Sequence, residues 1–140
     1  MYVLDTNIVI YFFKGMGGVA EEIFSKSPEE IFISAITLYE LEVGVAKSDN
    51  SSKTKTELDT FVSSIIVLPF TSKEARFSAE IRASLEAQGL PIGPLDNLIA
   101  GAALSVNATL VTHNTKEFNR VKGLRIEDWL NLPMDKSRGF

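Results

Sequence analysis

The chain begins MYVLDTNIVIYFF (residues 1–13), an apolar run that is interrupted by one carboxylate, Asp5. Residues 2–4 predict a buried strand, and residues 6–13 predict a helix that follows it directly. A buried carboxylate without a partner costs several kcal/mol. Asp5 therefore either lies in solvent at the end of the strand or meets a cation there. The structural interpretation is that it caps the helix that begins at Thr6, a position that aspartate favours.

Short apolar runs alternate with helical patterns along the rest of the chain. This alternation is typical of an α/β fold around a mostly parallel sheet. We expect a single domain, residues 1–134, with a twisted sheet of four or five strands flanked by helices, and a disordered tail at 135–140. A strand order of 3-2-1-4 would place the first strand at the centre. The sequence predicts further strands at 31–34, 65–70, 108–112 and 124–129, helices at 38–48, 57–65, 71–90 and 95–107, and a polar loop, SDNSSKTKT, at 48–56.

Composition limits the classes of protein and of site. The 140 residues include no cysteine, which excludes a disulfide framework and a thiolate metal site and fits a cytoplasmic location. No apolar run approaches the ~18 residues of a membrane span, and no signal-peptide pattern opens the chain, so we expect no membrane partner. The net charge of −4 does not attract nucleic acid through the overall field. Binding of RNA or DNA would require a local basic face or bound cations.

Acidic side chains follow the predicted strands at several points. In open parallel sheets, ligands bind beyond the carboxyl ends of the strands. We therefore expect four separate segments to bring oxygen ligands to one edge of the sheet. These are Asp5 after the first strand, Glu40 in the first turn of the helix after the second, Asp96 in the first turn of the helix opened by PIGPLDN, and Thr112, Asn114 and Glu117 in VTHNTKEF after the fourth.

Each acid also has a structural interpretation when it is taken alone. Glu40 is the third residue after Thr37, which is a T-x-x-E capping box, and the same pattern recurs at 71–74. Asp96 is a favourable charge at the positive end of a helix. The single histidine, His113, is expected to be a surface residue rather than a metal ligand.

Taken together, the acids indicate a cation site. Carboxylates gathered at one sheet edge repel one another and raise at least one pKa, and a divalent cation removes that repulsion. Oxygen ligands without cysteine or a histidine cluster favour Mg²⁺ or Mn²⁺ over zinc. Mg²⁺ takes one or two protein carboxylates and accepts phosphate oxygens from a substrate, so the pattern indicates phosphate chemistry.

With these residues in view, the sequence resembles the PIN-domain ribonucleases, and among them the VapC-type toxins of bacterial type II toxin–antitoxin pairs. The resemblance covers nearly the whole chain and rests on the order and spacing of VLDTNIVIYF, ISAITLYELEVGV, PIGPLDNLIAGAAL and LVTHNTKEF with GLRIEDW. It implies that the metal-binding acids are Asp5, Glu40 and Asp96, and that the supporting hydroxyl and amide positions are Thr6, Asn7, Ser34 and Thr112.

One position departs from the family pattern. Many members place a fourth acid at or near position 114, where this chain has an amide, Asn114. Glu117, three residues later, is a candidate for the missing catalytic charge. With a neutral residue at 114, we expect one tightly bound ion, and a second only when substrate phosphate arrives.

The resemblance also implies an activity and partners. It implies endonucleolytic cleavage of RNA by a metal-activated water, with a free 3′-hydroxyl product and transfer RNA, cut in the anticodon region, as substrate. It further implies a homodimer and a VapB-type antitoxin that blocks the acidic site. Among the basic residues, Lys116 and Arg120 are the best candidates for RNA contacts because they follow the expected site edge directly.

Three other functions remain open at this point. A phosphatase of the haloacid-dehalogenase kind also begins with a strand that ends in Asp, but it needs a second acid two residues later, where this chain has Asn7. A receiver-like module gathers acids around Mg²⁺, but it usually has adjacent acids early in the chain and a lysine after a late strand. A non-catalytic PIN interaction domain would have no need of three carboxylates at one edge.

Overall fold

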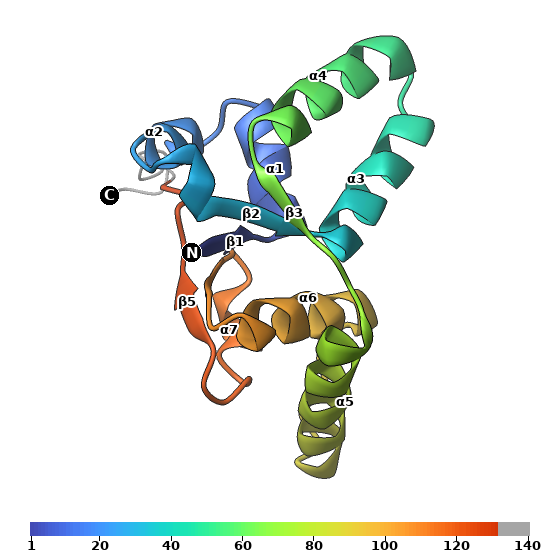
Figure 1. Cartoon of the computed structure of the whole chain (residues 1–140), viewed down its shortest axis with the longest axis vertical. Helices are drawn as coiled ribbons and strands as arrows, with labels where there is room; N and C mark the ends of the chain where they lie inside the picture. The colour runs from blue at the N-terminus through green and yellow to red at the C-terminus, as the bar shows by residue number, and fades with distance from the viewer. Residues whose placement is uncertain (132–140) are drawn as a thin grey trace, which may run out of the picture.

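The computed structural model describes residues 1–131, which form a five-stranded sheet between two layers of helices (Figure 1). All neighbouring strands are parallel, and their order is β3-β2-β1-β4-β5. The α/β class and the central position of the first strand are therefore confirmed. The predicted domain end at 134 and the tail at 135–140 lie outside the described residues. The strands are β1 (Tyr2–Leu4), β2 (Ile31–Ser34), β3 (Ile66–Leu68), β4 (Thr109–Val111) and β5 (Arg125–Glu127).

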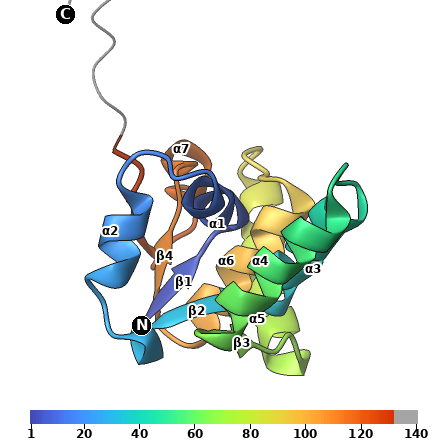
Figure 2. The same ribbon diagram turned by 90° about the horizontal axis from the view of Figure 1, so that it is seen from above.

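The helices cover both faces of the sheet, with α1 to α4 on one side and α5 to α7 on the other (Figure 1), and the two layers overlap in the view from above (Figure 2). Helix α2 and a single 3₁₀ turn at Pro28–Glu30 have no counterpart among the predicted elements, whereas α7 is the helix that was expected to carry Glu117 in its first turn. None of the helices in residues 1–131 is long and apolar enough to span a membrane. The α-helices are α1 (Thr6–Phe13), α2 (Val19–Phe24), α3 (Ala35–Ala46), α4 (Ser51–Ser63), α5 (Ser72–Ala87), α6 (Pro94–Ser105) and α7 (Thr115–Phe118).

Two apolar cores fill the spaces above and below the sheet. Successive side chains of a strand point to opposite faces, so Leu4 packs in the core under α1 to α4, while its neighbour Val3 packs in the core under α5 to α7. Both side chains are fully buried. Burial on both faces explains why the strands appear in the sequence as continuous apolar runs.

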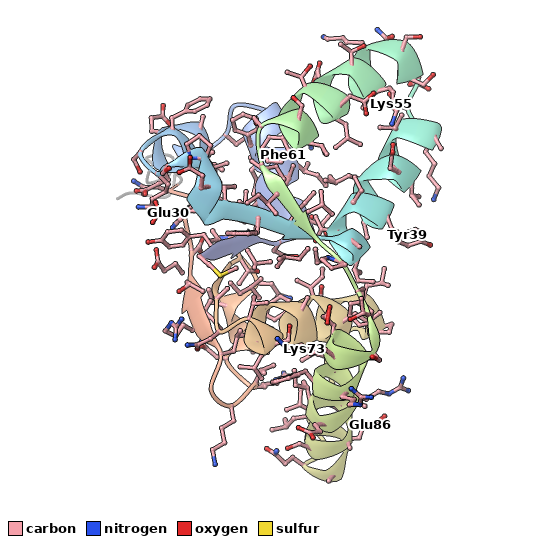
Figure 3. All side chains as sticks on the ribbon, viewed as in Figure 1. Glu30, Tyr39, Lys55, Phe61, Lys73 and Glu86 are labelled. Atoms are coloured by element: carbon pink, nitrogen blue, oxygen red, sulfur yellow. The ribbon has the colours of Figure 1, made fainter. Side chains whose placement is uncertain are left out.

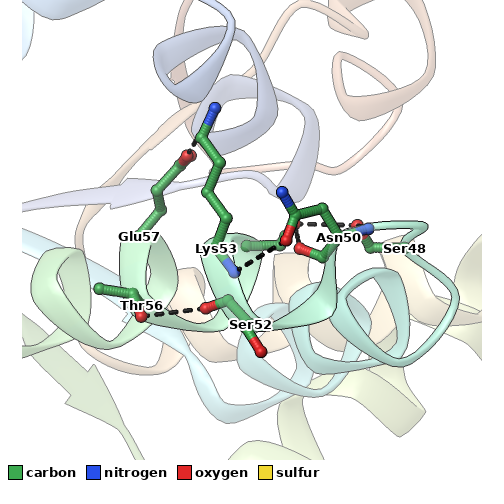
Figure 4. A network of polar contacts seen from close by, with 7 residues as sticks. Ser48, Asn50, Ser52, Lys53, Thr56 and Glu57 are labelled. Carbon is green, nitrogen blue, oxygen red and sulfur yellow. Dashed lines mark hydrogen bonds and ion pairs between the residues drawn. The ribbon is translucent and has the colours of Figure 1, made fainter.

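The predicted loop at 48–56 is wrong, because α4 begins inside it at Ser51. The side chain of Asn50 caps this helix by accepting a hydrogen bond from the backbone N–H of Lys53 at 3.4 Å (Figure 4). Ion pairs one turn apart, Lys53 with Glu57 and Lys55 with Asp59, add small contributions. Local capping and charge pairing thus give a helix in a stretch whose composition is typical of a loop.

Helix α4 folds back on α3 and reaches α1. Lys55 forms a 2.9 Å ion pair with Glu42 of α3, and the ring of Phe61 packs against those of Phe12 and Phe13 (Figure 3). Between α1, α2 and α4 lies an apolar groove of about 710 Å³. Phe24, which lines it, is 75% exposed.

Helices α5 and α6 cross at very short range. Gly101 of α6 lies directly against Ser78 of α5, and a Cβ atom at Gly101 would stand 2.9 Å from the Ser78 Cα atom. The side-chain amide of Asn97 donates a 2.8 Å hydrogen bond to the Ser78 carbonyl oxygen. The small side chains within residues 95–107 therefore allow α6 to pack closely against α5, as the composition of this segment predicts.

Candidate functional site

Asp5 lies at the carboxyl end of the central strand and is only 4% exposed. Its two carboxylate oxygens accept hydrogen bonds at 2.8 Å, one from the backbone N–H of Thr6 and one from the hydroxyl of Thr112. Asp5 is thus the N-cap of α1, as the structural interpretation of the sequence predicts. Burial raises the pKa of Asp5, the two hydrogen bonds lower it, and the charge of Glu40 raises it further.

Glu40 also lies at this edge of the sheet, but its position in helix α3 differs from the prediction. Helix α3 begins at Ala35 with Ser34 as its N-cap, so Glu40 lies in the second turn and not in the first. The predicted capping box of Thr37 and Glu40 is wrong, because the Thr37 backbone N–H donates to the Ser34 side chain instead. Glu40 accepts a 2.7 Å hydrogen bond from the hydroxyl of Thr6. Thr6 therefore contacts Asp5 through its backbone and Glu40 through its side chain.

Asp96 stands in the first turn of α6, as predicted. The pKa of its carboxyl is raised from 3.8 to about 6, chiefly by burial and then by the charges of Asp5, Glu117 and Glu40. These three acids come from three other segments of the chain, so four segments bring acids to one edge of the sheet, as expected. A carboxyl so perturbed, in company with other acids, is a candidate for a functional group.

In the segment after β4, Asn114 is hydrogen-bonded to Glu117. The backbone N–H of Asn114 donates to the Thr112 hydroxyl at 3.0 Å, and its side-chain amide donates to a Glu117 carboxylate oxygen at 3.1 Å. The charge of Glu117 acts on Asp96, whereas Asn114 is neutral. Of the two residues considered for the fourth acidic position, Glu117 is the one whose charge acts on Asp96, and the Asn114 amide is hydrogen-bonded to it.

The remaining candidate residues differ in their exposure and in their hydrogen-bond partners. Asn7 and Lys116 are exposed, and neither side chain forms a hydrogen bond or ion pair with residues 1–131. The Arg120 guanidinium donates to the Pro91 carbonyl oxygen at 3.0 Å, which ties it to the loop before α6. His113 is a surface residue, as expected, and its ring contacts the Asp128 carboxylate at 2.9 Å.

Within residues 1–131, the acids at this edge have no cationic partner. None of the ion pairs within residues 1–131 includes Asp5, Glu40, Asp96 or Glu117. In the same residues, no three histidine, cysteine, aspartate or glutamate side chains are grouped closely enough to hold a metal ion by themselves. An all-oxygen set that offers one or two carboxylates at a time fits Mg²⁺ or Mn²⁺, which complete their coordination with water and substrate phosphate.

Comparison with known proteins places the chain in a family. The sequence pattern of the PIN domain matches residues 2–124. The chain belongs to the PIN domain family. Two relatives are the tRNA(fMet)-specific endonuclease VapC of Shigella flexneri, 42% identical over 91% of this chain and 97% of the relative, and ribonuclease VapC2 of Rickettsia felis, 39% identical over 92% and 98%. The resemblance to VapC-type PIN ribonucleases is therefore confirmed, and with it the class of nuclease.

Solved structures agree with the PIN assignment. The VapC-like chain in the crystal structure of VapBC2 from Rickettsia felis, bound to a DNA fragment from its promoter, superposes with a TM-score of 0.86 at 39% identity, covering 91% of this chain and 98% of that one. A chain in the DNA-bound VapBC structure from Salmonella typhimurium has the same TM-score at 38% identity, covering 91% and 97%. The haloacid-dehalogenase and receiver alternatives are not supported by either comparison.

The raised pKa of Asp96 predicts a pH-dependent stability. The folded protein binds more protons at Asp96 than the unfolded chain between its usual pKa of 3.8 and about 6, so the free energy of unfolding falls as the pH rises through this window. In chelator, Asp96→Asn should be more stable than wild type by about 1 kcal/mol near neutral pH, since solvent screens part of the repulsion, and equally stable near pH 4.

Urea unfolding at both pH values measures this difference. Asp49→Asn makes the same chemical change at an exposed position between α3 and α4, and should be neutral at both. A loss of stability in Asp96→Asn near neutral pH would contradict the assignment of repulsion to this carboxyl.

Proposed function

We propose that this chain is a divalent-metal-dependent endoribonuclease and the toxin of a VapBC-type pair. The observation that carries the proposal is the gathering of acids at the carboxyl edge of the sheet, where Asp96 lies near Asp5, Glu117 and Glu40 from three other segments; burial first, and then the charges of these acids, raise the pKa of the Asp96 carboxyl. Such repulsion opposes folding, and it is removed when a cation binds there. The names of the VapC relatives, which are ribonucleases and tRNA endonucleases, support RNA as the substrate.

The residues that would hold the metal are Asp5, Asp96 and Glu40, with Mg²⁺ or Mn²⁺ as the ion. When bound, a divalent ion at these carboxylates activates water and offsets the negative charge that develops at phosphorus.

Neighbouring side chains form hydrogen bonds with the acids at this edge of the sheet. Thr6 and Thr112 hold both oxygens of Asp5 and partly offset the rise that burial causes in its pKa. Glu40, which accepts a hydrogen bond from the Thr6 hydroxyl, and Glu117, which accepts one from the Asn114 amide, are the proposed acceptors of a proton from an attacking water. Lys116 remains the exposed cation that we propose for RNA backbone contact, with Arg120 contributing from the Pro91 loop.

The proposal extends to partners and location. Transfer RNA is the substrate class that one relative's name specifies, and VapB-type antitoxins accompany the chains in the similar VapBC structures. We propose the same for this chain, together with a homodimer and a cytoplasmic location, where cellular RNA is found. The apolar groove between α1, α2 and α4, with Phe24 75% exposed, is a surface that a partner segment would cover.

Incubation of the purified protein with total RNA tests the activity. We expect cleavage with Mg²⁺ or Mn²⁺, loss of cleavage in EDTA, recovery when the ion is added back, and fragments that carry 3′-hydroxyl ends. Asp5→Asn and Asp96→Asn should both be inactive. Cleavage that survives EDTA and both substitutions would exclude the metal mechanism, and 2′,3′-cyclic phosphate ends would show attack by the ribose instead of water.

A further inference from the structure

Beside Asp96 stands a buried amide that none of the proposed chemistry uses. Asn97 is 5% exposed, and its side-chain N–H donates a 2.8 Å hydrogen bond across the helix interface to the carbonyl oxygen of Ser78 in α5. Only the amide nitrogen can donate to a carbonyl, so this bond also fixes the orientation of the Asn97 side chain. The contact joins the first turn of α6 to the middle of α5.

This hydrogen bond lies one residue away from an acid of the proposed metal site. Asp96 precedes Asn97 in the same helical turn, and its carboxyl forms no hydrogen bond of its own to residues 1–131. The placement of Asp96 relative to Asp5 and Glu40 therefore depends on where α6 begins. Two contacts to Ser78 hold this part of α6 against α5: the hydrogen bond of the Asn97 amide in the first turn and the close approach of Gly101 in the next.

We propose that Asn97 is a positioning residue for Asp96, acting through its hydrogen bond to the Ser78 carbonyl to fix the first turn of α6 at the metal-binding edge. This inference rests on the proposed function. Removal of a residue that orients a metal ligand changes the metal affinity or the activity by about 10–100-fold. A buried amide that only contributed to stability would change neither quantity.

The test is Asn97→Leu, which has a similar volume without the donor, and Asn97→Ala, which removes the side chain with less risk of a clash. We expect both to weaken Mn²⁺ binding to the RNA-free protein by about tenfold, measured by electron paramagnetic resonance. With Mn²⁺ saturating, kcat for RNA cleavage should fall by about 10–100-fold while KM changes less than about twofold.

Ser105→Ala is the matched control. Ser105 is buried near the other end of α6, and its hydroxyl bonds only within the helix, to the Ala102 carbonyl oxygen. It should lose stability but keep wild-type Mn²⁺ affinity and kcat. Wild-type affinity and kcat in a folded Asn97 variant would overturn this inference alone. A wild-type protein that binds no Mn²⁺ and cleaves RNA in EDTA would overturn the proposed function and this inference with it.

Discussion

Asp96→Asn is expected to reduce RNA cleavage by about 10³-fold while the protein stays folded. The stabilisation that a metal and its ligands give to charge at phosphorus is several kcal/mol, and each 1.36 kcal/mol is a factor of ten in rate. Asparagine keeps the shape of the side chain but loses the charge that attracts the ion. Because no hydrogen bond of residues 1–131 ends on the Asp96 carboxyl, the substitution should break no contact of the fold.

The measurement is the initial rate of RNA cleavage at fixed Mg²⁺, with circular dichroism to verify folding. Asp49→Asn, at an exposed position away from the site, controls for the change in net charge and should cleave at the wild-type rate. Asp5→Asn is a less clean test, because the Asp5 carboxylate also accepts hydrogen bonds from Thr6 and Thr112. Activity of Asp96→Asn within tenfold of wild type would remove Asp96 from the proposed set of ligands.

Gly101→Ala should destabilise the protein by about 3 kcal/mol, the upper part of the range for overpacked cores. The new Cβ atom would stand about 2.9 Å from both the Cα and the Cβ atoms of Ser78, and closer still to its hydroxyl. Since one obstacle is backbone, a rotation of the Ser78 side chain cannot relieve the clash. Helices α5 and α6 would have to separate, and the start of α6 would move with them.

Gly44→Ala is the control for this prediction, because Gly44 is also a glycine inside a helix but has open space at its Cβ position. It should stabilise the protein by up to about 1 kcal/mol through helix propensity. Adding Ser78→Ala to Gly101→Ala should recover part of the loss, since the Ser78 hydroxyl is buried without a hydrogen-bond partner within residues 1–131. Thermal and urea unfolding measure all four proteins. Equal effects of the two glycine substitutions would contradict the close crossing.

The sheet and the position of most acids could be predicted because they depend on local patterns. Buried parallel strands appear as short apolar runs, and the residue that follows such a strand must lie at its carboxyl edge. This reasoning placed Asp5 at the centre and Asp96 at the start of its helix, where the structure has them. The similarity to PIN domains then follows from the order of these segments along the chain.

Features that depend on competition between local partners were harder to predict. Thr37 and Glu40 have the spacing of a capping box, but Ser34 lies one turn earlier and takes the cap, so Glu40 is released to bond with Thr6. Asn50 likewise starts a helix inside a polar stretch that was predicted as a loop. The hydrogen bond between Asn97 and Ser78 joins residues that are 19 positions apart, and no local sequence pattern predicts it.

Titration of the metal-free wild-type protein with Mn²⁺, followed by electron paramagnetic resonance, tests the central claim most directly. The claim is that Asp5, Asp96 and Glu40, which come from three segments, form one cation site. It predicts one tightly bound ion per chain, an affinity at least tenfold lower in Asp96→Asn, and an unchanged affinity in Asp49→Asn. No binding by the wild type, or equal binding by wild type and Asp96→Asn, would contradict it.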